Sequence, residues 1–264
     1  MSVRRKIEGL RQLWHFDNRW QLIVMRAVFP HEPIQIYRID GVQILSDQSA
    51  GDANGAREVL ATPMYRKFVR AMTLASPLKV LDLGANNGGF PLLLKTLGYE
   101  LARTACVEMN PTTFSRLRYN IESNLREHFV LYNAAVCGTA RELELRLGSG
   151  STGDSIYQTG RSTEAGRAYT IEGTTFDDVY ANAFGDEIVD ICKMDIEGAE
   201  YEVFATPNHS ALAKCRYLIM ELHDGKDREP LRVLKHLNES GFVELPVNRA
   251  IGEAVYGFKN TALS

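Results

Sequence analysis

The strongest constraint on the fold is an alternation of short apolar runs, glycine-containing loops and helical patterns that begins at Leu78. The first unit is KVLDLGA followed by FPLLLKTLG, a helical segment that ends at Gly98, and further apolar runs follow at TACVEM, FVLYNAAVCG, VDICKMDI and YLIMELH. Strands that alternate with helices predict a mostly parallel sheet with right-handed crossovers, an α/β fold. Because ligands of such sheets bind at the carboxyl ends of the strands, the functional residues are expected there.

Length and composition are those of an ordinary globular protein. The chain has 264 residues, of which 45% are hydrophobic and 24% charged, enough for one large domain or two small ones. This composition excludes a disordered chain, a collagen and a small disulfide-stabilised protein. The formal net charge of −3 gives no general attraction to nucleic acids or anionic membranes, so we expect no nucleic-acid partner.

The cysteines and the N-terminus indicate a cytoplasmic protein. The four cysteines are scattered without a CxxC pair, so they predict neither a zinc knuckle nor a disulfide framework. Three of them lie in apolar runs, and buried, unpaired thiols suit a reducing compartment. The N-terminus is basic but no apolar signal sequence follows, and no apolar run is long enough to predict a membrane span.

The first 75 residues lack the alternating pattern. Apolar spacing in RRKIEGLRQLWHFDNRWQLIVMRAVF predicts a helix that the following prolines end. IQIYRIDGVQILSD predicts two strands around Asp40-Gly41, and REVLATPMYRKFVRAMTLA predicts a helix interrupted at Pro63. We therefore divide the chain into an extension, residues 1–75, and a main domain, residues 76–264. The extension either caps the substrate pocket or forms a homo-oligomer contact.

Three later segments refine this pattern. Pro111 predicts the start of the helix TTFSRLRYNIESNL, since proline is tolerated in the first helical turn. The alternating, glycine- and serine-rich region from LELRLGSG to IEGTTF predicts a hairpin excursion with a mobile loop near residues 148–166. The final segments FVELPV and AVYGFKN predict antiparallel strands.

The sharpest single feature is the loop that follows the first strand of the main domain, VLDLGANNGGF. Gly84 lacks a Cβ atom, so the backbone can turn tightly and a ligand can approach it closely. The dinucleotide fingerprint GxGxxG is absent, because Ala85-Asn86 stand where its second glycine would be. Asp82 would repel a phosphate, and an acid there suits a cationic ligand such as the amino-acid end of S-adenosylmethionine.

The next two strands end in polar residues that suit an adenosine. Glu108 ends the second strand, 26 residues after Asp82, where a carboxylate can accept both ribose hydroxyls. Asn133 lies at the end of the third apolar run. Its amide either hydrogen-bonds the adenine edge or caps a turn, and the sequence leaves both interpretations open.

The motifs DLGANNGGF, VEMNP, NAAV and KMDIEGAE together resemble the FkbM-type family of S-adenosylmethionine-dependent O-methyltransferases. The resemblance covers about residues 40–260 and is most specific at KMDIEGAE. It implies a seven-stranded, Rossmann-like class I methyltransferase fold in residues 76–264 and methyl transfer to a hydroxyl of a sugar, glycolipid or secondary metabolite. The residues expected to hold the cofactor are Asp82, Gly84, Ala85, Asn86, Glu108 and Asn133.

The ends of the fourth and fifth strands carry the expected catalytic residues. Asp195 and Glu197 are two residues apart, and Glu221 and His223 share a face of the fifth strand because side chains alternate. Methylating an alcohol requires its proton to leave, and histidine takes up protons near neutral pH. We therefore predict that Asp195 and His223 position and deprotonate the acceptor, with Glu197 in support.

A metal offers a second route at the same place. A divalent ion held by Asp195, with Glu197 or Glu221, would lower the pKa of the acceptor hydroxyl. An oxygen-rich ligand set suits Mg²⁺ or Mn²⁺ rather than zinc. The sequence leaves the choice between general base and metal open.

Two other classes of function compete with a small-molecule O-methyltransferase. One is a methyltransferase that acts on nucleic acid or protein, which an acidic site entrance and the absence of a [DN]PPY run disfavour. The other is a methyltransferase-like module that binds without turnover, which the intact glycine loop, Glu108 and Asp195 disfavour. A nicotinamide-dependent dehydrogenase is the weakest alternative, because its phosphate-binding loop is missing.

Overall fold

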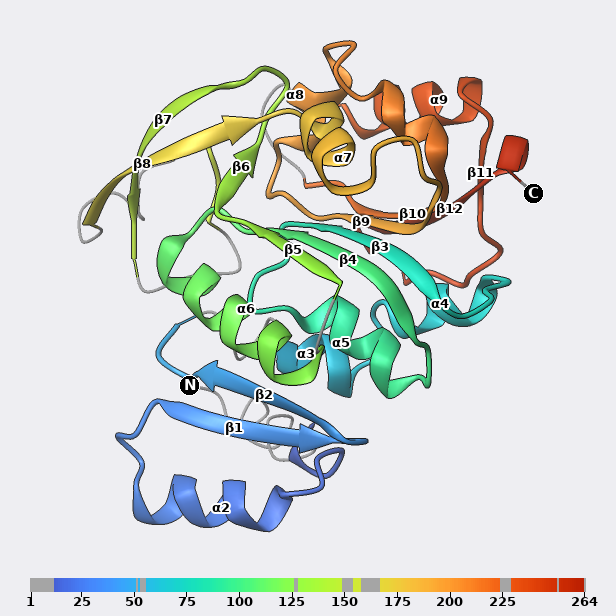
Figure 1. Ribbon diagram of the computed structural model, residues 1–264. Coiled ribbons are helices and arrows are strands. Elements are labelled where there is room, and N and C mark those ends of the chain that lie inside the picture. The colour runs from blue at the N-terminus through green and yellow to red at the C-terminus, as the bar shows by residue number, and fades with distance from the viewer. Residues whose placement is uncertain are drawn as a thin grey trace.

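The centre of the structure is a seven-stranded, mostly parallel sheet with helices on both faces, a Rossmann-like arrangement (Figure 1). The computed structural model describes residues 12–50, 52, 56–125, 128–148, 154–157, 167–223, 229–250 and 252–263. The strand order is β11-β12-β10-β9-β3-β4-β5, in which β12 runs antiparallel to both of its neighbours. The strands are β3 (Leu78–Leu83), β4 (Leu101–Val107), β5 (Phe129–Tyr132), β9 (Val189–Met194), β10 (Cys215–Glu221), β11 (Phe242–Glu244) and β12 (Val255–Asn260).

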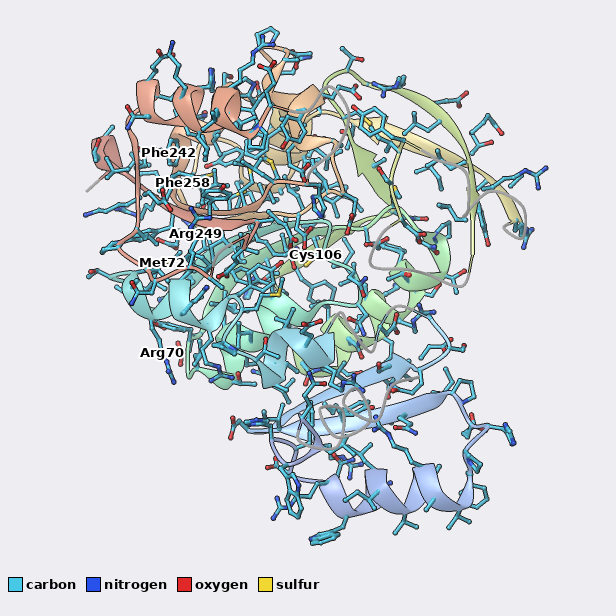
Figure 2. The ribbon with its side chains drawn as sticks, turned by 180° about the vertical axis from the view of Figure 1, so that it is seen from behind. Arg70, Met72, Cys106, Phe242, Arg249 and Phe258 are labelled. Carbon is cyan, nitrogen blue, oxygen red and sulfur yellow. The ribbon has the colours of Figure 1, made fainter. Side chains whose placement is uncertain are left out.

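The sheet separates two apolar cores. Its helices are α5 (Gly89–Thr96), α6 (Pro111–Asn124), α7 (Phe176–Phe184), α8 (Glu200–Phe204) and α9 (Pro230–Glu239), with the 3-10 turns η2 (Ser210–Lys214) and η3 (Thr261–Leu263). Because strand side chains alternate, Val80 of β3 packs with α5 and α6, whereas Leu81 packs with α7, α8 and α9. Figure 2 shows Phe242 and Phe258 in the second core, across the sheet from Met72. The expected α/β fold is thus confirmed.

The third apolar run does not form the single strand that the sequence predicts. The chain breaks at Asn133, so that β5 stays in the main sheet and β6 (Ala134–Val136) joins β7 (Arg141–Leu147) and β8 (Arg167–Thr174) in a second sheet, ordered β6-β8-β7. The break occurs because the Asn133 amide donates to the backbone carbonyls of Glu108, at 2.8 Å, and Met109, at 3.0 Å. The predicted hairpin excursion is confirmed as the antiparallel pair β7–β8. Residues 149–153 and 158–166 of its predicted mobile loop lie outside the described residues.

The extension forms the predicted hairpin and the predicted helix interrupted at Pro63. Strands β1 (Ile34–Ile39) and β2 (Val42–Asp47) pair around Asp40-Gly41, and α3 (Ala56–Ala61) and α4 (Arg66–Ala71) flank Pro63. The predicted first helix is not continuous, because turns at residues 14–18 precede α2 (Arg19–Val28). There the Asn18 side chain bonds to the backbone of the hairpin, at Ile36 and Arg38, instead of continuing a helix. The part of this prediction that falls on residues 4–11 lies outside the described residues.

Two asparagines of α6 dock the hairpin onto the main domain. Asn120 accepts a hydrogen bond from the Leu45 amide at 2.7 Å and donates to the Leu45 carbonyl at 3.0 Å. Asn124, one turn later, forms the same pair of bonds with Gln43 at 2.9 and 2.6 Å. The two side chains thereby pair with the free edge of β2 as a neighbouring strand would. Asn120 also donates to the carbonyl of Asn87 in the glycine loop at 2.8 Å, which connects the hairpin to that loop.

Replacing Asn120 with alanine is expected to lower the free energy of unfolding by about 2–3 kcal/mol, since three hydrogen bonds to buried or half-buried backbone groups are lost at about 1 kcal/mol each. Urea denaturation followed by circular dichroism measures the change. Arg118→Ala, on the exposed side of the same helix, is the control and should stay within about 0.5 kcal/mol of the wild type. Equal effects of the two substitutions would contradict the docking role of Asn120.

Candidate functional site

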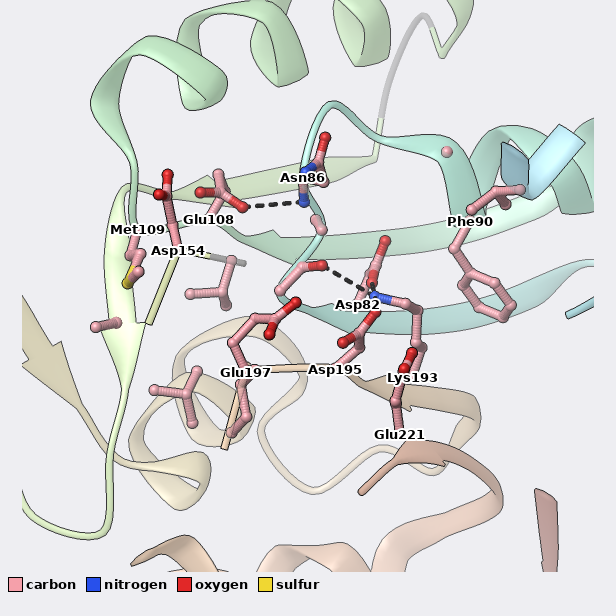
Figure 3. A pocket seen from close by; sticks show the side chains of 18 of the residues that line it. Asp82, Asn86, Phe90, Glu108, Met109, Asp154, Lys193, Asp195, Glu197 and Glu221 are labelled. Atoms are coloured by element: carbon pink, nitrogen blue, oxygen red, sulfur yellow. Dashed lines mark hydrogen bonds and ion pairs between the residues drawn. The ribbon is translucent and has the colours of Figure 1, made fainter. Parts of the chain in front are cut away.

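A cavity of about 320 Å³ opens at the carboxyl ends of the parallel strands, where the sequence places the functional residues (Figure 3). Its walls come from β3, β4, β9 and β10, from β6, and from residues 58–65 of the extension. The acidic residues that line it are Glu58, Asp82, Glu108, Asp154, Asp195, Glu197 and Glu221. Lys193 is the single lysine or arginine among its described lining residues.

Gly84 sets the shape of the cavity floor. Its φ angle of +73° lies in the left-handed region, and a Cβ atom there would lie 1.7 Å from the carbonyl oxygen of Asp195. The loop from β3 therefore passes directly against the end of β9, which no other residue type allows without a shift. Asn86 follows with φ of +48°, and Ala85 and Asn86 both line the cavity as predicted for the cofactor loop.

Asp82 and Lys193 form a buried ion pair under this loop. The two residues are register partners on β3 and β9, and Lys193 Nζ lies 3.2 Å from Asp82 Oδ1 and donates to the Gly84 carbonyl at 2.9 Å. Burial alone would lower the pKa of Lys193, but the charges of Asp82 and Asp195 outweigh it and raise that pKa. Asp82 Oδ2 is fully buried and has no hydrogen-bond partner among the described residues, although Asp82 lines the cavity. Burial raises the pKa of Asp82, and the charge of Lys193 opposes that rise. That Asp82 binds the cationic end of a cofactor stays a prediction.

Glu108 lies at the opposite wall from this pair and is held by backbone amides. Its Oε2 accepts from the Asn86 amide at 3.0 Å, and its Oε1 accepts from the Asn110 amide at 2.7 Å. Burial raises the pKa of Glu108 to about 7. Each carboxylate oxygen keeps a second lone pair for a ligand hydroxyl, as the predicted ribose contact requires. Asn133, expected near the adenine, is not among the described lining residues, and its amide supports the Glu108 backbone instead.

Asp195 contacts both Lys193 of the ion pair and Tyr65 of the extension. Its Oδ2 lies 3.6 Å from Lys193 Nζ and accepts a hydrogen bond from the Tyr65 hydroxyl at 2.9 Å. Glu221 lines the same wall, and burial followed by repulsion from Asp195 raises the pKa of Glu221 to about 7. A carboxylate with that pKa exchanges protons near neutral pH. Figure 3 shows Asp195 and Glu221 near Lys193, with Glu197 farther along the same side of the cavity.

His223 lies among the carboxyl groups of Glu197, Glu200 and Glu221. Its Nε2 is 3.2 Å from Glu197 and 3.9 Å from Glu221, and its Nδ1 is 3.4 Å from the fully buried Glu200. Burial alone would lower the pKa of His223, but the nearby carboxyl groups of Glu197 and Glu200 outweigh it and raise that pKa to about 11. A raised pKa favours the imidazolium, which holds a proton, whereas a general base must take one up. That His223 is the general base stays a prediction. The raised pKa depends in part on Glu200, whose place at a helix start resembles that of an ordinary helix-capping acid.

Two of the three expected metal ligands, Asp195 and Glu197, lie close together with His223. One donor atom each from Asp195, Glu197 and His223 lie within 4.8 Å of one another, whereas the sequence predicts Glu221 rather than His223 as the third. A metal takes neutral imidazole, so it would have to displace the proton that Glu197 and Glu200 hold on His223. The donor set can hold a divalent ion only at the cost of that salt bridge.

The sequence predicts that the extension caps the pocket or forms an oligomer contact, but it does not identify which residues of the extension reach the cavity. Tyr65 is buried, lines the cavity, and stacks edge-on against Phe90 while bonding Asp195. Glu58, Val59 and Met64 line the same side of the cavity. No local motif signals these residues, since their segment has only the spacing of an amphipathic helix.

Substituting Gly84 with alanine is expected to be far more damaging than substituting Gly98, although both have positive φ angles, of +73° and +86°. Alanine at Gly98 meets no atom within 4 Å, so only the backbone strain of about 1–2 kcal/mol applies. Alanine at Gly84 adds the clash with Asp195, so the loss in unfolding free energy should be at least twice as large. Urea denaturation of both variants compares them, and equal losses would contradict the close approach at Gly84.

Comparison with known proteins places the chain in a family. The sequence model for the methyltransferase FkbM domain matches residues 82–244, more than half of the chain, whereas no curated protein matches significantly. Similar solved structures include a methyltransferase FkbM from Methylobacillus flagellatus KT, 15% identical over 71% of this chain and 44% of that one, with a TM-score of 0.48. P. horikoshii TYW2 in complex with MeSAdo is 15% identical over 86% of this chain and 70% of that one, with a TM-score of 0.40. M. capricolum TrmK in complex with S-adenosyl-homocysteine is 9% identical over 75% of this chain and 68% of that one, also with a TM-score of 0.40. The chain thus spans less than half the length of the M. flagellatus protein. On the match over residues 82–244, this chain belongs to the FkbM methyltransferase family.

Proposed function

We propose that the protein is an S-adenosylmethionine-dependent O-methyltransferase that methylates a hydroxyl of a small molecule, such as a sugar, a glycolipid or a secondary metabolite. One observation carries the proposal: Lys193 joins Asp82 to Asp195, so a site suited to a cationic cofactor adjoins a carboxylate-rich site within one cavity. The match to the family supports methyl transfer, and the cavity chemistry supports the choice of acceptor.

The residues at one end of the cavity fit the cofactor. The buried, unpartnered oxygen of Asp82 suits the amino group, the tight turn at Gly84 leaves room for the amino-acid portion, and Glu108 suits the ribose hydroxyls. When bound, S-adenosylmethionine supplies an electrophilic sulfonium methyl group. The sulfonium and amino groups of S-adenosylmethionine give its amino-acid portion a net positive charge, which matches the acidic lining of the cavity.

The other end suits an acceptor that must lose a proton. Glu221, with a pKa of about 7, is the best-matched proton acceptor, and Asp195 is aligned by Tyr65 to accept a hydrogen bond from the acceptor hydroxyl. His223, as an imidazolium, offsets the negative charge of Glu197 and Glu200 and positions the cluster. This assignment moves the base from His223 to Glu221.

The charge of the lining favours a neutral hydroxyl acceptor. Among the described lining residues, seven are acidic and the one lysine is already paired with Asp82, so a phosphate group would meet repulsion. This supports a small molecule over a nucleic acid. The four cysteines are buried and unpaired, which supports the proposed cytoplasmic location. The contacts of Glu58 and Tyr65 support the extension as a cap on the acceptor side.

Binding of S-adenosylhomocysteine should tighten as the pH rises through 7. Glu108 accepts the ribose hydroxyls as a carboxylate, and below its pKa of about 7 a proton must leave before binding. The Kd is therefore expected to rise by up to about tenfold per pH unit below 7. Calorimetric titrations across pH 5.5–8.5 measure this slope. Glu108→Gln should flatten it, whereas the exposed control Glu122→Gln should retain it, and a slope that survives Glu108→Gln would contradict the role of Glu108.

Glu221→Gln and Asp195→Asn are expected to lower methyl transfer to hydroxyl acceptors by about 10²–10⁴-fold while S-adenosylhomocysteine still binds. Transfer of labelled methyl groups to a panel of sugars, glycolipids and polyhydroxylated metabolites measures the activity. EDTA should leave the wild-type rate unchanged, and a rate that EDTA abolishes and Mg²⁺ restores would replace the general base with a metal. Binding without transfer to any acceptor would favour a non-catalytic module.

A further inference from the structure

The adenine base of the proposed cofactor needs a polar partner that the strand ends do not supply. Glu108 suits the ribose hydroxyls, so the base attached to that ribose is expected beyond Glu108, on the side away from Lys193 (Figure 3). Asn133, the residue expected at the adenine edge, donates to two backbone carbonyls instead. The polar edge of the base therefore requires a different residue.

The cavity wall on that side of Glu108 is apolar except for one carboxylate. Met109, residues 134–136 of β6 and Ile156 supply the apolar surface. Among the described lining residues from these segments, Asp154 is the one charged side chain besides Glu108, and Figure 3 shows it beside Met109 and Glu108. An apolar wall with one well-placed polar group suits a flat base whose polar atoms lie at its edge.

The hydrogen-bonding chemistry of Asp154 selects one kind of base. A carboxylate only accepts hydrogen bonds, and the exocyclic amino group of adenine donates them. A base that presents a carbonyl at the same position would instead be repelled. Asp154 also lies near the ribose site, since its charge adds to the effect of burial, which raises the pKa of Glu108 to about 7.

Contacts on both sides of the cavity hold the segment that carries Asp154. The side-chain amide of Asn110 donates to Asp154 Oδ2 at 2.6 Å, and the Ser155 hydroxyl donates to the backbone carbonyl of Glu197 at 2.7 Å. Asn110 is buried and is itself held in place, because its Oδ1 accepts from the Thr112 amide at the start of α6. The carboxylate of Asp154 is thus oriented by the protein, which lowers the entropic cost of binding a ligand there.

We propose that Asp154 binds the 6-amino group of the adenine and makes the protein selective for an adenosine cofactor. This inference rests on the proposed function and deepens it, because it assigns the part of the cofactor that neither Asp82 nor Glu108 contacts. The specificity contact then comes from the segment between β7 and β8 rather than from the end of a strand in the main sheet.

Two ligands that differ in one group test the contact. They are S-adenosylhomocysteine and its 6-deamino analogue, in which hydrogen replaces the amino group of the purine, and calorimetric titration measures the Kd of each. The wild type should bind S-adenosylhomocysteine about 10–100-fold more tightly than the analogue, the usual effect of a hydrogen bond to a charged group. Asp154→Ala should weaken S-adenosylhomocysteine binding by a similar factor and bind the two ligands about equally.

Asp186→Ala is the matched control, because it removes a fully exposed carboxylate elsewhere and should discriminate between the ligands as the wild type does. Circular dichroism establishes that each variant is folded. Equal affinity of the wild type for the two ligands would overturn this inference and leave the proposed function standing. Discrimination that survives Asp154→Ala would assign the amino group to another residue. Binding of neither ligand by the folded wild type would overturn the proposed function and this inference together.

Discussion

The ammonium group of Lys193 is the interaction on which the site depends. It lies between Asp82 on one strand and Asp195 at the end of the next, and it also donates to the carbonyl of Gly84. Burial raises the pKa of Asp82, and the charge of Lys193 opposes that rise. In the proposed function, Lys193 therefore joins the carboxyl group that would bind the cofactor to the one that would bind the substrate hydroxyl.

The extension supplies part of the cavity wall and is hydrogen-bonded to the loop at the cavity floor. Asn120 and Asn124 pair with the edge of β2, and Asn120 continues to the glycine loop, so the hairpin is connected to the turn at the cavity floor. The following helices bring Tyr65 to Asp195. The acceptor side of the cavity is therefore built from two parts of the chain that are 130 residues apart in sequence.

The sequence predicts best the features that depend on local pattern. The carboxyl ends of parallel strands meet at one edge, so Asp82, Glu108, Asp195 and Glu221 are expected together and do line one cavity. The break at Asn133 is not visible in FVLYNAAV, because it depends on carbonyls of another segment.

The sequence also does not predict the contact of Tyr65 with Asp195 or that of Glu200 with His223. Tyr65 reaches the site only through the docking of the extension, which no local motif encodes. The protonation state of His223 depends on the buried carboxylate of Glu200, which reads in sequence as an ordinary acid at a helix start. Prediction fails where a residue's role depends on contacts that form only in the folded chain.

The central claim is that the cavity beside Lys193 holds S-adenosylmethionine. Calorimetric titration of the folded chain with S-adenosylhomocysteine tests it most directly. The account predicts one micromolar site per chain, with the affinity lost in an Asp82→Ala/Glu108→Ala variant that circular dichroism shows to be folded. No heat of binding from the folded wild type, or undiminished binding by the double variant, would contradict it.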